Sequence, residues 1–305
     1  MKFAEIQFSA KKEDFGVHKI LLKLPHSILN WYLLQYHPFY IEEMKLANVE
    51  GYKVKLYQNL EQQTEKQKKQ IEKLLLLLEQ KDVIVLLTNC NIIPPDNIKI
   101  CYGTILNSFL VLQAAQKAIK RQYKTLQESR FLIVDGENSI TNLVLDILHP
   151  HVNYLSIYTN RQQYFTKKAE QIYENYGLCL EIFTGEKNKL FETFNVIINC
   201  SNAMDNYDYK IQKNAFYFDI VQNKPKMQRL LSRRNDLLLS DGLLLKWQNN
   251  TYYSKQLEAI FCITENHFHH FLYYDYHQQS VEEIKNLLQQ KKITVTGFTC
   301  FEKRT

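Results

Sequence analysis

The middle of the chain alternates between short apolar runs and segments with helical spacing. The runs have the length and the Val, Ile, Leu and aromatic content of buried strands. They lie at 130–134, 154–158, 179–183, 196–199, 216–220 and 236–239. Segments 139–148 and 162–176 repeat apolar residues every three or four positions, which predicts helices. Strands that alternate with helices in this way indicate an α/β fold with a doubly wound parallel sheet.

The flanking regions predict a second, smaller α/β domain. Strands are expected at 2–8, 52–57, 83–87 and 98–101, with helices at 25–36 and 60–80. A long helix is expected at 106–127, then C-terminal helices at 257–274 and 280–290 and a strand at 293–301. We therefore expect an N-terminal substrate-side domain at 1–105, a linking helix at 106–127 and a Rossmann-like domain at 128–255. Residues 256–305 are expected to return to the N-terminal domain.

Composition adds limits on class and location. No apolar run reaches the roughly 18 residues of a membrane span, and the N-terminus lacks a signal-peptide pattern. The six cysteines form no Cys-x-x-Cys pair, as expected for free thiols in the cytoplasm. The net charge is +6, and the basic clusters at 66–69 and 229–234 are typical of solvated helix faces. We do not expect nucleic acid as a partner, and nothing in the pattern indicates an oligomeric state.

Glycine is scarce where a dinucleotide would need it. The chain has 8 glycines in 305 residues, under half the usual share of about 7%. In a Rossmann fold the first turn after a strand carries three glycines that let the pyrophosphate approach the backbone. Here the same turn has one glycine and two carboxylates that repel a diphosphate. The candidate cofactor-binding residues of this turn are Asp135, Gly136, Asn138, Ser139, Ile140 and Thr141, and Glu137 supplies the second carboxylate.

Two later turns complete the candidate cofactor site. Thr159, Asn160 and Arg161 follow the second strand, where an arginine can bind the 2′-phosphate of NADP. A solvated turn with an ordinary surface arginine is the alternative. Ser201 follows the fourth strand, at the edge of the sheet where ligands usually bind.

These segments resemble the shikimate-dehydrogenase-like Rossmann domain of long-chain acyl-acyl carrier protein reductases. The resemblance rests on segments 135–148, 159–161, 195–203 and 214–245, and on Phe-Cys-Ile-Thr-Glu at 261–265. It covers nearly the whole chain in order and spacing, at low identity. It implies an enzyme that takes an acyl group from an acyl carrier protein or acyl-CoA and reduces it with NADPH.

The resemblance also assigns residues. The family's nucleophilic cysteine matches Cys262, and Glu265 follows it as a helix-capping or site carboxylate. The three glycines of the family's dinucleotide motif fall on Asp135, Asn138 and Thr141. Acyl transfer through Cys262 is thus retained in this pattern, while the glycines that NADPH needs are replaced.

Three readings of function remain open from the sequence. The first is a reductase in which Cys262 lies near a helix start that lowers its pKa, with His267, His269 or His270 as base. The second is a non-catalytic Rossmann-like protein without a cofactor, which serves as a binding or regulatory partner. The third is nucleic-acid binding through the basic cluster at 229–234. In the second reading, Cys262 is a small buried hydrophobic residue.

Overall fold

The computed structural model describes residues 1–9, 12–15, 21–57, 65–88, 92–185, 190–203, 210–274, 278–301 and 303–304. Contacts divide the chain into two compact units. The first unit comprises Met1–Tyr102 and Glu258–Tyr274, and the second comprises Gly103–Leu257 and Asp275–Thr305. The segment expected to return whole to the N-terminal domain is therefore divided, with residues 258–274 in the first unit and residues 275–305 in the second.

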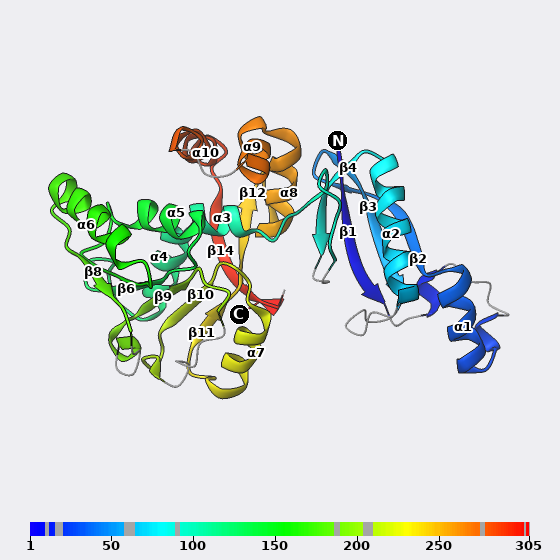
Figure 1. The fold of residues 1–305 in the computed structure, drawn as a ribbon, viewed down its shortest axis with the longest axis horizontal. Helices are drawn as coiled ribbons and strands as arrows, with labels where there is room; N and C mark the ends of the chain where they lie inside the picture. Colours follow the sequence, from blue (N-terminus) through cyan, green and yellow to red (C-terminus); the bar gives the residue numbers. More distant parts are fainter. Residues whose placement is uncertain are drawn as a thin grey trace. The chain divides into compact units, whose positions relative to one another are not determined.

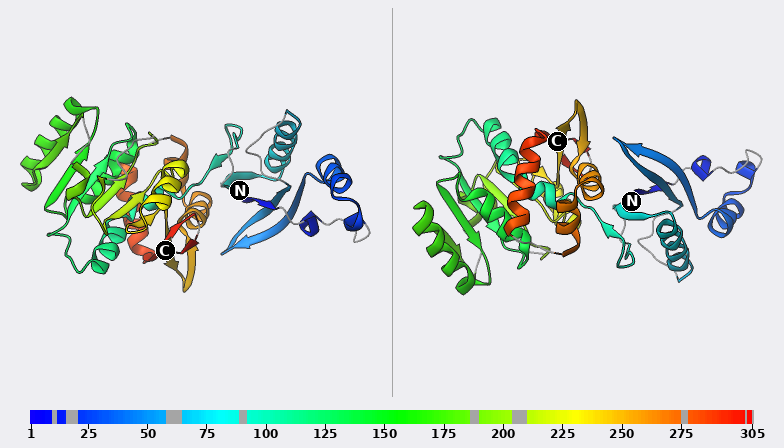
Figure 2. Two further views of the ribbon diagram at one scale, coloured as in Figure 1. Left: turned by 90° about the horizontal axis from the view of Figure 1, so that it is seen from below. Right: turned by 90° about the horizontal axis from the view of Figure 1, so that it is seen from above.

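The first unit contains a five-stranded sheet in the order β2-β3-β1-β4-β5, which Figure 2 shows from two sides. β2 pairs with β3 as an antiparallel hairpin, and the other neighbours are parallel. The strands are β1 (Lys2–Ser9), β2 (Phe39–Leu46), β3 (Val49–Tyr57), β4 (Val83–Thr88) and β5 (Lys99–Ile100), with helices α1 (His26–Tyr36), α2 (Glu65–Gln80) and α9 (Asn266–Tyr274). Ile71, Leu74, Leu75 and Leu78 repeat at helical spacing, and this face of α2 packs in one core cluster with strand residues.

The second unit is built on a six-stranded sheet in the order β11-β10-β9-β6-β7-β8. All its neighbouring strands are parallel. This is the doubly wound order of the dinucleotide-binding α/β fold, so the predicted fold class is confirmed. The strands are β6 (Arg130–Val134), β7 (Tyr154–Tyr158), β8 (Leu180–Phe183), β9 (Val196–Asn199), β10 (Phe216–Asp219) and β11 (Leu238–Ser240).

Helices cover both faces of this sheet. α5 (Ser139–Leu148) and α6 (Gln162–Tyr176) connect β6 to β7 and β7 to β8, and α7 (Lys224–Arg233) connects β10 to β11. Figure 1 shows α5 and α7 on opposite sides of the strands. Met227 and Leu230 of α7 pack in one core cluster with Leu132, Ile197 and Tyr217. Adjacent strand residues point to the other face, as expected for strands buried on both sides.

A second, antiparallel sheet in this unit has the order β13-β12-β14-β15. Its strands are β12 (Gly242–Trp247), β13 (Asn250–Tyr253), β14 (Thr294–Cys300) and β15 (Lys303–Arg304). α10 (Gln278–Gln290) precedes β14 in the chain. Because β14 pairs with β12, the predicted final strand belongs to the second unit.

Two predicted helices are broken. The linking helix is divided into α3 (Thr104–Phe109) and α4 (Val111–Arg121) by Leu110, whose ψ of 10° is not helical. The helix expected at 257–274 is divided into α8 (Ser254–Thr264) and α9 at Glu265. No helix in the described ranges combines the length and the apolar character needed to cross a membrane.

Candidate functional site

The candidate cofactor residues gather at one edge of the six-stranded sheet. Turns after β6, β7 and β9 carry them, and because these strands are parallel, the turns lie at the same carboxyl edge. The order of strands reverses between β6 and β9, which is where ligands bind in open α/β sheets. The structure thus brings the predicted residues together at this edge, and their role in binding stays a prediction.

The turn after β6 is closed by its own hydrogen bonds. Asn138 caps α5: its Oδ1 accepts from the backbone N–H of Thr141 at 3.0 Å and from the Thr141 hydroxyl at 3.1 Å. The Thr141 Oγ1 in turn accepts from the backbone N–H of Gly136 at 3.1 Å. Asn138 Nδ2 donates to the carbonyl of Cys200 at 3.1 Å. The backbone N–H groups of Gly136 and Thr141 therefore already have partners within the turn.

Gly136 is the one glycine left in this turn, and packing explains it. A Cβ added at this position would overlap the carbonyl group of Cys200 in the turn after β9. Glu137, in contrast, adopts a left-handed conformation with φ 57° that usually favours glycine, and its side chain is exposed. Gly136 thus allows the turn after β6 and the turn after β9 to pack closely together.

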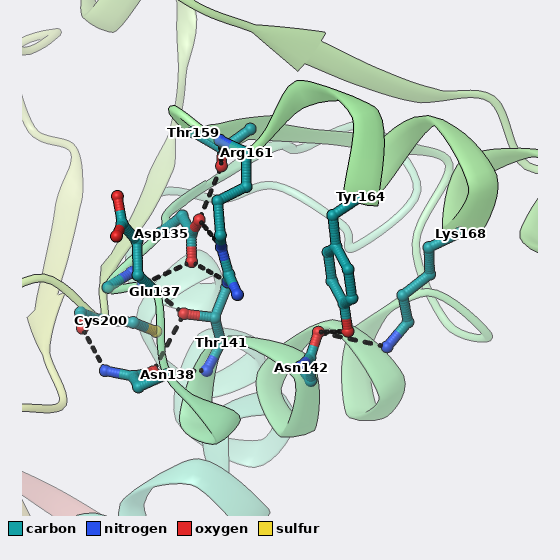
Figure 3. Close-up of polar contacts among 11 residues, drawn as sticks. Asp135, Glu137, Asn138, Thr141, Asn142, Thr159, Arg161, Tyr164, Lys168 and Cys200 are labelled. Carbon is teal, nitrogen blue, oxygen red and sulfur yellow. Dashed lines mark hydrogen bonds and ion pairs between the residues drawn. The ribbon is translucent and has the colours of Figure 1, made fainter.

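Asp135 and Arg161 form an ion pair between the turns after β6 and β7 (Figure 3). Arg161 donates from Nη2 to Asp135 Oδ1 at 2.7 Å and from Nε to Oδ2 at 3.0 Å. Thr159 Oγ1 donates to Oδ2 at 2.6 Å, and the backbone N–H of Glu137 donates to Oδ1 at 2.8 Å. The Asp135 side chain is only 1% exposed. Four donors therefore hold one buried carboxylate.

The Arg161 guanidinium is fixed on its other side by aromatic rings. It lies 5.0 Å from the centroid of the Tyr164 ring and 5.3 Å from that of Phe165. Tyr164 donates its hydroxyl to Asn142 Oδ1 at 3.1 Å, and Lys168 donates to the same oxygen at 3.5 Å (Figure 3). These contacts join α6 to α5 and hold the arginine in place.

The charges of this pair stabilise each other. Burial raises the pKa of Asp135, but hydrogen bonds from Arg161, from Thr159 and from the N–H of Glu137 outweigh it, so the pKa lies below its ordinary value. The hydrogen bond to Asp135 raises the pKa of Arg161. Both groups are therefore charged over the whole physiological range.

These residues do not fit NADPH in the usual way. The pyrophosphate would meet a turn whose Gly136, Glu137 and Thr141 N–H groups donate internally. The 2′-phosphate would need the guanidinium of Arg161, which is engaged in two hydrogen bonds to Asp135. A Rossmann turn that binds a dinucleotide presents both kinds of donor to the ligand.

The other predicted residues contribute less to this network. Asn160 is exposed, and Ser139 and Ile140 form the first turn of α5. Ser201 Oγ accepts from the backbone N–H of Ala203 at 3.1 Å, which shapes the turn after β9. The role of all these residues in cofactor binding stays a prediction.

A second polar network at the same edge was missed from the sequence. Asn199, Asp219 and Lys226 are each fully buried. Asn199 Nδ2 donates to Asp219 Oδ1 at 2.8 Å, and Lys226 Nζ donates to Asn199 Oδ1 at 3.2 Å. Burial raises the pKa of Asp219 to about 6, although Asn199 and the charge of Lys226 oppose the shift. Asp219, at the end of the apolar strand β10, was the feature of the sequence that could have indicated this network.

Asn107 of α3 was also missed. It is fully buried, and neither Nδ2 nor Oδ1 has a hydrogen-bond partner among the described residues. Because an unpaired buried amide is costly, this side chain is a candidate functional group. A single Asn in this short helix gave no distinct signal in the sequence.

Cys262 does not lie at a helix start, as the sequence led us to expect. α8 begins at Ser254, so Cys262 lies in its last turn, and its side chain is fully buried. The Cys101 thiol contacts it at 3.8 Å between sulfur atoms. Glu265, which follows α8, is partly exposed. The helix dipole at this end does not favour a thiolate, so the physical reason for a reactive Cys262 is removed.

No group of three or more His, Cys, Asp or Glu side chains able to hold a metal ion occurs in the part of the chain that the structure describes. Cys101, Cys200, Cys262 and Cys300 are buried free thiols, and Cys179 is exposed. Desolvation of Cys300 raises its thiol pKa to about 12.

Comparison with known proteins gives matches of fold only. No protein-family model matches the chain, and no curated protein matches it. Among solved structures, L-tryptophan dehydrogenase from Nostoc punctiforme is 14% identical over 95% of this chain and 80% of that chain, with a TM-score of 0.37. Shikimate 5-dehydrogenase from Listeria monocytogenes is 10% identical over 94% and 96%, with a TM-score of 0.35. The 5-ketofructose reductase of Gluconobacter sp. strain CHM43 is 12% identical over 93% and 98%, with a TM-score of 0.36.

At these TM-scores the similarity supports no functional inference. The class of this protein follows from its own strand order, which is that of Rossmann-type α/β proteins. No comparison supports a relation to acyl carrier protein reductases in particular.

The Asp135 carboxylate predicts a specific pH dependence. Its folded pKa lies below the unfolded value of about 3.9, so its stabilisation is complete above that value and is lost as pH falls through the folded pKa. Urea unfolding of wild type and Asp135→Asn should therefore show a difference that is constant from about pH 7 to about pH 5 and shrinks towards about pH 3. A difference that stays the same down to about pH 3 would contradict the buried ion pair.

Proposed function

We propose that this chain is a non-catalytic relative of Rossmann-fold oxidoreductases that acts as a binding or regulatory partner. The observation that supports this is the Asp135–Arg161 ion pair, in which a carboxylate of the chain occupies the donors that a dinucleotide would use. The fold that holds nucleotides is retained, while the turn is filled by internal contacts.

The cost of reopening the turn is large enough to matter. Freeing Arg161 for a phosphate would leave the carboxylate of Asp135 buried without its strongest partner. The penalty for such a loss is about 3 kcal/mol, which corresponds to a loss of affinity of about 150-fold. A dinucleotide site of ordinary micromolar affinity would then bind only near the millimolar range. The carboxylate of Glu137, exposed in the same turn, adds repulsion.

The acyl-thioester reading of Cys262 has less support. A nucleophilic cysteine needs a thiolate and access to its substrate, and Cys262 is buried against Cys101. The NADPH that such a reductase would use is disfavoured by the turn described above. The acyl-thioester reductase is therefore the alternative hypothesis that the experiments below test.

The closed turn predicts that wild type binds NADPH only weakly. Isothermal titration calorimetry of the purified chain with NADPH should show no saturable binding below about 1 mM, because Arg161 and the turn N–H groups are engaged. The variant Asp135→Ser releases the guanidinium and should bind NADPH at least about tenfold more tightly than wild type.

Arg130→Gln is the matched control, because Arg130 pairs with Glu181 at 3.9 Å in an exposed setting and should leave NADPH binding unchanged. Saturable wild-type binding below about 100 μM that Arg161→Gln abolishes would overturn the proposal.

Cys262 should be unreactive in the native protein. After incubation with hexadecanoyl-CoA, intact-mass and peptide mass spectrometry should find no acyl adduct on Cys262, because its thiol is buried. Iodoacetamide provides the internal control: exposed Cys179 should be alkylated in the native protein, and Cys262 only after unfolding. A hexadecanoyl adduct on native Cys262 that Cys262→Ala removes would favour the enzyme instead.

A further inference from the structure

A polar pocket lies at the opposite end of the six-stranded sheet from the closed turn. It is bounded by the end of α4 and by residues that precede β9, β10 and β11, such as Asn195, Asn214 and Leu237. Because the strands are parallel, this is the amino edge of the sheet. The volume of the pocket is about 550 Å³, within the range of small-ligand sites.

The pocket carries an excess of positive charge. Arg121, Lys124 and Lys213 line it, and Asp236 is the acidic residue among its lining residues. Asp236 is itself held by Arg234, which donates from Nε at 2.8 Å and from Nη2 at 2.7 Å. Arg121 and Lys124 have no ion pair with any residue that the structure describes. The site therefore favours an anion.

Tyr123 lines the same pocket in a strained conformation. It follows the C-terminus of α4 with φ 56°, and its N–H donates to the carbonyl of Lys120 at 3.2 Å. The N–H of Lys124 donates to the carbonyl of Ile119 at 3.3 Å, which completes a helix-ending motif that usually has glycine at this position. The tyrosine is 99% exposed, so no packing of its ring offsets the strain.

Amide groups close the other side of the pocket. Asn214 is a second lining residue in the left-handed region, with φ 61°. Gln122 donates from Nε2 to the carbonyl of Asn214 at 2.9 Å and so ties the end of α4 to the segment before β10. Gln212 and Asn195 add further donors and acceptors. An aromatic ring, cationic side chains and amides thus line one cavity.

We propose that this pocket binds a nucleoside phosphate. Arg121, Lys124 and Lys213 supply charge for the phosphate, and the exposed ring of Tyr123 supplies a surface on which a base stacks. Side-chain amides provide hydrogen bonds to the edge of a base. The site is separate from the closed turn, so this proposal does not depend on the proposed function. The nucleotide can be free or one unit of a single strand.

Two probes distinguish these sources. UMP is titrated by calorimetry, and a fluorescein-labelled oligouridylate of about ten nucleotides is followed by anisotropy at about 50 and about 200 mM salt. Saturable UMP binding indicates a free nucleotide. Binding of the oligonucleotide alone, with an affinity that falls steeply with salt, indicates a single strand. Binding of neither probe overturns the proposal.

The variant Tyr123→Gly distinguishes a loss of base stacking from a loss of stability. It relieves the strained backbone, so the unfolding midpoint in urea should rise, while binding of the probe should weaken about tenfold. Lys124→Gln should weaken binding and reduce the salt slope by about one. Tyr173→Ala removes another exposed tyrosine, on α6, and should leave binding unchanged. If Tyr123→Gly binds as tightly as wild type, or if a polyglutamate peptide binds as well as the oligonucleotide, the nucleotide assignment is wrong.

Discussion

The ion pair between Asp135 and Arg161 joins the ends of two neighbouring parallel strands, and the closed turn depends on it. Asp135 follows β6 and Arg161 follows β7, and the carboxylate also accepts from Thr159 and from the backbone of its own turn. A buried carboxylate is tolerated only when such donors surround it. The same donors are those that a nucleotide phosphate would require. One interaction therefore both stabilises this edge of the sheet and competes with the ligand that the fold usually binds.

The scarcity of glycine affects two features of the chain: its left-handed backbone positions and the side chains in the turn after β6. Among the described residues, ten non-glycine residues and three glycines adopt positive φ. The chain thus accepts strain at left-handed positions in general, so the loss of glycine from the turn is not in itself a functional signal. What is specific is the choice of side chains: Asp135 brings a charge that Arg161 neutralises, and Asn138 brings a cap that consumes a backbone donor. Gly136 is retained where the carbonyl of Cys200 leaves no space.

Much of the fold could be predicted because its signals are local. The bounds of β6, α5, β7, α6 and β9 agree with the apolar runs and helical spacing of the sequence. The hairpin of β12 and β13 was not predicted, because Gln248 and Asn249 make its turn with positive φ and without glycine. α7 was treated only as a basic cluster, although Asn223 caps it and Pro225 follows in its first turn.

The candidate site was harder to predict because the roles of its residues depend on contacts between positions far apart in the sequence. Asp135 and Arg161 are 26 positions apart, and separately each suggested a different role: a repulsive charge and a phosphate ligand. Only their proximity shows that they satisfy each other. Cys262 illustrates the same limit, because α8 begins at Ser254 and ends at Thr264, which places Cys262 in its last turn, and its contact Cys101 is 161 positions away in sequence.

The most direct test of this account is a double-mutant cycle between Asp135 and Arg161. Free energies of unfolding in urea at about pH 7 are compared for wild type, Asp135→Asn, Arg161→Gln and the double variant. If the pair closes the turn as described, the coupling energy should be at least about 1.5 kcal/mol, as expected for charge-assisted hydrogen bonds of a buried carboxylate. A coupling energy below about 0.5 kcal/mol, the level of an exposed ion pair, would contradict it.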